Sequence, residues 1–125
     1  MAKSKIVAIV GEAAIRKTLD DRGDRETTAM AVRYLLQLLA AKAPGNSVEV
    51  RVPPHGAVQV VEGPGHTRGT PPNVIEMDAD TWVALATGAT DWSAALAEAK
   101  VSASGSRADL AELLPLAWDD PTTKN

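Results

Sequence analysis

The two histidines are the first candidates for chemistry, and their surroundings do not form a catalytic or metal site. His55 and His66 both lie in segments rich in glycine and proline. A metal site would need a third ligand such as Glu62 or Asp78, and the sequence has neither a cysteine nor two histidines spaced for one helix face. We therefore expect both histidines to be structural or incidental, with no metal and no cofactor bound.

Nucleophilic catalysis and nucleotide binding also lack their sequence patterns. No serine lies in a G-x-S-x-G turn, and Ser104-Gly-Ser106 is better explained as a strand-to-helix connection. A single glycine follows the apolar run 6–10, so neither phosphate-binding glycine pattern is present. The absence of cysteine excludes disulfides and thiol nucleophiles. We expect a protein that is not an enzyme.

The segment 63–72 has the most unusual composition, with three glycines and three prolines around His66-Thr-Arg68. Arg68 and nearby backbone N–H groups could hold a carboxylate or a phosphate. Alternatively, Arg68 pairs with Glu62 or Glu76, which flank the segment, because an unpaired buried carboxylate is costly. We expect this second, architectural role.

The elements that must position these residues follow from the spacing of apolar side chains. The segment 1–23 is either a strand over 5–11 or, as we expect, a helix towards Leu19 that ends in the charged turn 20–24. The rest of the pattern predicts a helix over 27–43, strands at 48–52, 57–62, 73–77 and 101–104, and helices over 81–87, 92–99 and 110–114. Because their links are short, we predict that the first three strands form an antiparallel meander. Asp24, Asp91 and either Asp78 or Asp80 are candidate N-caps. The fold class is α+β with two layers.

Length and charge exclude several classes of protein. The 125 residues suit one domain, which we place at 25–118 after a helical extension at 1–24 and before a flexible tail at 119–125. With 13 basic and 16 acidic residues, the net charge of -3 argues against nucleic-acid binding. No apolar run is long enough for a membrane helix, so we expect no stable membrane insertion and a cytoplasmic protein.

An apolar pocket is the remaining candidate site. The alternation at 48–52 predicts that the three valines are buried while Glu49 and Arg51 are exposed or paired on the other face. A sheet face covered by short helices of small residues leaves space beneath it. Trp82 begins a helix and serves either as a core anchor or as part of a ligand cage. The residues expected to line or back this space are Val50, Val58, Val60, Met77, Trp82, Leu85 and Leu96.

A family resemblance agrees with the predicted α+β domain and its apolar pocket. The segments 78–88, 91–101 and 104–110 resemble the C-terminal half of the sterol-carrier-protein type 2 family, with an acidic cap, a threonine, a glycine stop and a second helix. The segments 47–63 and 66–74, which include His-Thr-Arg-Gly-Thr-Pro-Pro, resemble an actinobacterial branch of that family. A related domain is attached to proteins similar to maleylpyruvate isomerase. The resemblance covers roughly 25–118.

The resemblance implies a sheet of roughly five strands, mixed or antiparallel, with helices on one face and an apolar cavity between them. It implies no cofactor and no covalent chemistry. The expected function is binding of an acyl chain, a sterol-like molecule or another lipid. The alternative is a protein-interaction or self-association module, with a homodimer or a protein partner. Pro115 interrupts the long final helix that closes the ligand tunnel in lipid-transfer members.

Overall fold

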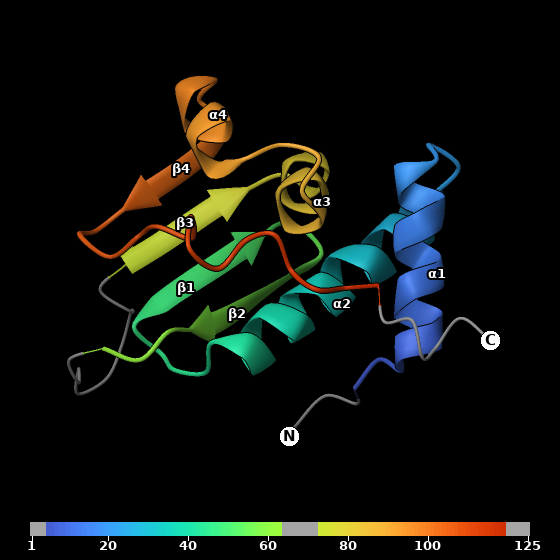
Figure 1. Ribbon diagram of the computed structural model, residues 1–125, viewed down its shortest axis with the longest axis horizontal. Helices are drawn as coiled ribbons and strands as arrows, with labels where there is room; N and C mark the ends of the chain where they lie inside the picture. The colour runs from blue at the N-terminus through green and yellow to red at the C-terminus, as the bar shows by residue number, and fades with distance from the viewer. Residues whose placement is uncertain (1–4, 64–72, 120–125) are drawn as a thin grey trace.

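The computed structural model describes residues 5–63 and 73–119 (Figure 1). Along the chain the elements are α1 (Ala8–Leu19), α2 (Arg25–Lys42), β1 (Val48–Val52), β2 (Gly56–Val60), β3 (Asn73–Met77), α3 (Ala79–Thr87), α4 (Trp92–Ala97) and β4 (Val101–Ser104). This order confirms the predicted α+β class and the helical interpretation of the first segment. The second strand ends earlier than predicted, because Val61 has a φ of 68° and leaves the extended conformation.

The four strands form one mixed sheet in the order β2-β1-β3-β4. β1 is antiparallel to β2 and parallel to β3, and β3 is antiparallel to β4. The predicted antiparallel meander was wrong, because the chain passes from the end of β2 to the far side of β1 before β3 begins. The predicted count of roughly five strands exceeds by one the number in the described part of the chain.

One face of the sheet is buried and the other is open. The alternate residues Val48, Val50 and Val52 are fully buried, and Ile75 lies beside them on β3. On the opposite face of β1, Arg51 pairs with Glu49 at 2.7 Å. The predicted register is therefore confirmed. Helices α2 and α3 contribute to the same core as the buried valines, so the helical layer covers one face of the sheet (Figure 1).

Aspartate N-caps fix where three helices begin. Asp24, Asp78 and Asp91 each accept a hydrogen bond from a backbone N–H three residues later, at 2.8 Å in all three cases. These donated hydrogen bonds favour the carboxylate and hold the pKa of Asp24 and of Asp78 below its usual value. At the other end of α3, Gly88 adopts a left-handed conformation with a φ of 87°. The caps predicted at these positions are confirmed.

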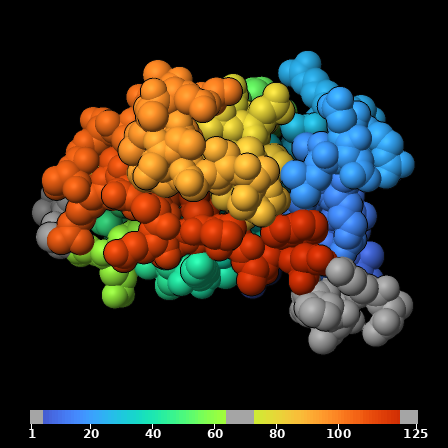
Figure 2. Space-filling model, turned by 45° about the horizontal axis from the view of Figure 1, so that its top comes forward, coloured from blue at the N-terminus to red at the C-terminus, as the bar shows by residue number. Residues whose placement is uncertain are grey.

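The segment 105–119 is a strap without regular secondary structure, so the helix predicted over 110–114 was wrong. Two of its leucines, Leu110 and Leu116, are buried in the core instead. The backbone N–H of Leu116 donates to the carbonyl of Ala86 on α3 at 2.8 Å. A run this short is a marginal helix, and Pro115 prevents its extension. Figure 2 shows the strap crossing the surface between α3 and α2 and reaching α1.

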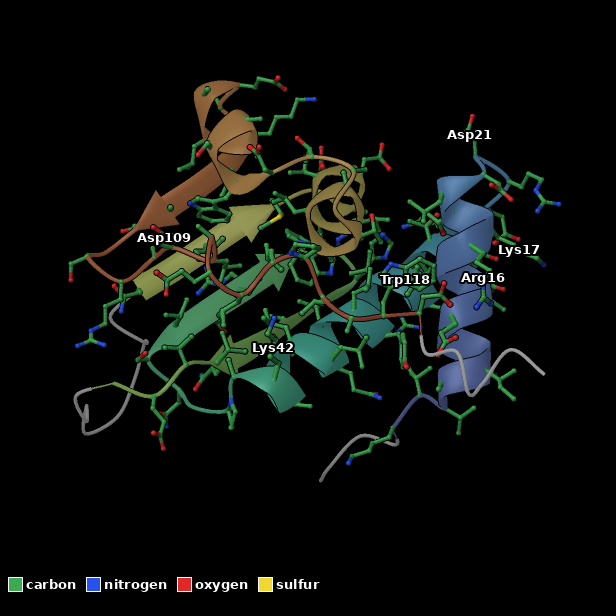
Figure 3. The ribbon with its side chains drawn as sticks, viewed as in Figure 1. Arg16, Lys17, Asp21, Lys42, Asp109 and Trp118 are labelled. Atoms are coloured by element: carbon green, nitrogen blue, oxygen red, sulfur yellow. The ribbon has the colours of Figure 1, made fainter. Side chains whose placement is uncertain are left out.

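Helix α1 packs on α2 and holds the end of the strap. Ile15 is fully buried in the core. Arg16 pairs with Glu12 at 3.2 Å and with Asp119 at 3.0 Å, and its guanidinium lies 5.8 Å from the centre of the Trp118 ring (Figure 3). None of the described helices is long and apolar enough to cross a bilayer.

Candidate ligand-binding site

Most of the residues predicted to line a pocket form a filled core instead. Val50, Val60 and Trp82 have no exposed surface, and Met77 and Leu85 are 4% and 1% exposed. The indole N–H of Trp82 donates to the carbonyl of Val32 at 3.2 Å, which anchors α3 to α2. None of these five residues lines any of the four hollows described below. Trp82 was expected to be either a core anchor or part of a ligand cage, and this contact makes it a core anchor.

The other two predicted pocket residues lie elsewhere. Leu96 is 43% exposed on α4 and lines none of the four hollows. The short helix α4 turns Trp92 and Ala95 inward, so Leu96 is directed towards solvent. Val58 is half-buried on β2 and does border an open space. It is the predicted residue that the structure places at a hollow.

This hollow, which we call the edge pocket, lies between α2 and β2, an edge strand of the sheet. Its volume is about 290 Å³. α2 supplies one wall with residues one turn apart, β2 supplies the opposite wall, and the segment before α1 supplies the rest. The lining residues are Lys5, Ile6, Arg33, Leu36, Gln37, Gly56, Ala57 and Val58.

Glycine at position 56 contributes to the opening. Gly56 pairs with Val52 and therefore lies on the buried face of the sheet. A β-carbon at Gly56 would lie 3.4 Å from a methyl carbon of Leu36 and 3.6 Å from Cγ of Arg33. Any larger side chain would extend into the space between β2 and α2. The absence of a side chain at Gly56 thus leaves space open beside Val58, which lies on the same face of the strand.

A side-chain clamp holds the N-terminal segment against the pocket. The backbone N–H of Ile6 donates to Oε1 of Gln37 at 2.9 Å, and Nε2 of Gln37 donates to the carbonyl of Ile6 at 3.0 Å. The side chain thereby pairs with both polar groups of one residue, as a neighbouring strand would. The clamp fixes Ile6 and its neighbour Lys5 beside the middle of α2.

Three further hollows differ from the edge pocket in their charges. One lies at the start of the strap and is lined by three acidic residues, Glu62, Asp109 and Glu112. One lies around the start of α3 and holds three acidic residues and Lys100. One lies between α1 and α2, with an apolar lining that includes Ile9, Val10 and Met30. The described residues contain no cluster of metal-ligating side chains.

The loop residues predicted to have an architectural role are only partly described. His66 and Arg68 lie outside the described residues. Glu62 and Glu76 are both exposed, so the cost of burying an unpaired carboxylate does not arise at either of them. The reason given for pairing them with Arg68 is therefore wrong, and the pairing itself stays a prediction. His55 is half-buried in the β1–β2 turn, where its backbone N–H donates to Val52 at 2.9 Å.

Sequence reasoning missed every edge-pocket residue except Val58. Arg33 and Gln37 were visible as polar positions one turn apart on α2. The predicted strand began at residue 57, so Gly56, the first residue of β2, was not assigned to a face of the sheet. The partner of Gln37 is 31 residues away, and no local pattern indicates that contact.

Comparison with known proteins assigns the chain to a family. The family model described as "Bacterial SCP ortholog" matches residues 24–116. The chain belongs to this family of bacterial proteins like the sterol carrier protein. No curated protein matches the sequence. The match of this sterol-carrier-like chain begins at Asp24, the N-cap of α2, so α1 and the clamped residues Lys5 and Ile6 lie outside it.

Proposed function

We propose that this sterol-carrier-like protein binds an apolar small molecule in the edge pocket, without a cofactor and without covalent chemistry. The observation that carries the proposal is the contrast between a filled core and an open hollow. The core residues beneath the sheet have almost no exposed surface, whereas Val58 and its neighbours border a space of about 290 Å³. Membership in the family supports a lipid-like ligand.

The size of the hollow limits the size of the ligand. Ligand sites commonly have volumes of about 300–1,000 Å³, so the edge pocket is at the lower end. At roughly 30 Å³ for a group the size of a water molecule, it holds about ten such groups. A chain of about eight buried methylenes would gain roughly 6 kcal/mol before entropy losses. We therefore expect a short apolar chain to bind at high micromolar to millimolar concentration.

An NMR titration with 1-octanol tests this proposal, because the ligand is neutral and fits the hollow. Saturable shifts should appear at the backbone amides of Leu36, Gln37 and Gly56 to Val58. Val58→Trp should fill the hollow and weaken binding at least fivefold. Gln59→Trp is the matched control, because Gln59 is exposed on the opposite face of the same strand and should leave binding unchanged. Absence of saturable shifts at these amides would reject the proposal.

A protein-interaction or self-association function is the second candidate, and an exposed apolar face on α1 favours it. Ile9 and Val10 are 66% and 45% exposed, and Val7 just before the helix is 63% exposed. Ile9 and Val10 border the hollow between α1 and α2. Sedimentation should detect association that Ile9→Lys abolishes. A monomer up to millimolar concentration would remove self-association from this candidate.

A further inference from the structure

The edge pocket combines an apolar lining with two positive charges. Lys5 and Arg33 are both exposed at the pocket, and no acidic residue is among its lining residues. Each of the other three hollows includes at least one carboxylate. This is notable in a chain whose net charge is -3, where acidic residues outnumber basic ones.

These two cations are also without an ion-pair partner within the described residues. Arg16, Arg22, Arg51 and Lys100 each lie within 4.0 Å of a carboxylate. Lys5 and Arg33 form no such pair with another described residue, so no carboxylate of residues 5–63 and 73–119 neutralises either charge. A guanidinium presents parallel N–H donors that match the two oxygens of a carboxylate.

Lys5 lies outside the matched family region, and a contact with that region holds it at the pocket. The clamp between Gln37 and Ile6 holds the preceding residue, Lys5, at the pocket, opposite β2. Arg33 lies one turn before Gln37 on α2, so the two cations come from separate segments held together by the clamp. Since the family match begins at residue 24, the N-terminal segment adds a charge that the matched domain does not supply.

We propose that the edge pocket selects a small amphiphile with one carboxylate, whose oxygens contact Arg33 and Lys5 while its short chain lies against Ile6, Leu36 and Val58. This inference rests on the proposed function and names the class of ligand for the same site. A neutral chain of equal length would lose the charged contacts. A bulky sterol would exceed the volume of the hollow.

Comparison of octanoate, 1-octanol and octylammonium tests the inference with chains of equal length. We expect octanoate to bind about five- to tenfold more tightly than 1-octanol at low salt, because hydrogen bonds to charged groups at an exposed site are of this strength. Octylammonium should bind more weakly than 1-octanol. The preference for octanoate should fall as the ionic strength rises to about 0.15 M, where the Debye length is about 8 Å.

Variants that remove one positive charge test whether the preference for octanoate arises at the edge pocket. Arg33→Gln and Lys5→Gln should each reduce the ratio of octanoate affinity to 1-octanol affinity at least twofold. Arg25→Gln is the matched control, because Arg25 is exposed on the same helix and does not line the pocket, yet the change alters net charge equally. The control should keep the full preference.

The possible outcomes separate this inference from the function on which it rests. Equal affinity for octanoate and 1-octanol would overturn the charge selection and leave the proposed function intact. An octanoate preference that survives in both pocket variants, or that falls equally in Arg25→Gln, would also overturn it. If neither ligand gives saturable shifts at the pocket amides, the proposed function fails and the inference fails with it.

Discussion

Gly11→Ala reverses the effect that this substitution usually has in a helix. Alanine in place of a helical glycine ordinarily stabilises a protein by about 0.5–1 kcal/mol. In this chain a β-carbon on Gly11 would lie 2.5 Å or less from three ring carbons of Tyr34, and both residues are buried. Overpacking a well-packed core costs about 1–3 kcal/mol. The expected net change is a loss of about 1–2 kcal/mol in the free energy of unfolding.

Thermal and urea unfolding measure this change, which corresponds to roughly 4–8 °C in Tm for a domain of this size. Ala13→Gly, at an exposed position of the same helix, reports the propensity term alone and should cost about 0.5–1 kcal/mol. In a Tyr34→Ala background the ring is absent, and Gly11→Ala should then stabilise or have no effect. A rise in Tm for the single variant Gly11→Ala would refute the close packing of α1 on α2.

Three further changes test other parts of the fold. Asn73→Ala should lower stability by about 2–3 kcal/mol, because buried Asn73 donates to Ser47 and accepts from the backbone of Arg107, each at 2.8 Å; a loss below about 0.5 kcal/mol would contradict these bonds. Asp78→Ala should cost about 1 kcal/mol at pH 7 by removing an N-cap. The lowered pKa of Asp78 means that this contribution is present above its ordinary pKa of about 3.9 and is lost as the pH falls through the lower pKa of the folded state. The stability difference between the two proteins should therefore shrink below about pH 4, and a constant difference down to pH 2 would contradict the cause given. Val60→Trp should destabilise by about 1–3 kcal/mol in urea unfolding, because Val60 is fully buried in a filled core; unchanged stability would show open space there.

Local signals in the sequence predicted much of the fold. The aspartate caps at Asp24, Asp78 and Asp91 act on backbone groups three residues away, so the sequence carries the whole interaction. The alternation at 48–52 specifies a buried face wherever that strand lies in the sheet. These features were predicted correctly because neighbours along the chain determine them.

Long-range packing decided the features that were not predicted. β3 presents the same alternation on either side of the hairpin, so its parallel pairing with β1 could not be inferred from its residues. The leucines at 110, 113 and 114 have helical spacing, but tertiary contacts hold that segment as the strap. The edge pocket depends on the contact between Gln37 and Ile6, and five of the seven predicted pocket residues lie in the core instead.

A crystal structure of the protein with octanoate tests the central claim most directly. The account predicts density for the chain between α2 and β2, in contact with Leu36 and Val58, with the carboxylate oriented towards Arg33. The buried side chains of Val50, Met77 and Leu85 should keep their positions. Density for the ligand beneath the sheet among those three residues, with the edge pocket empty, would contradict the account.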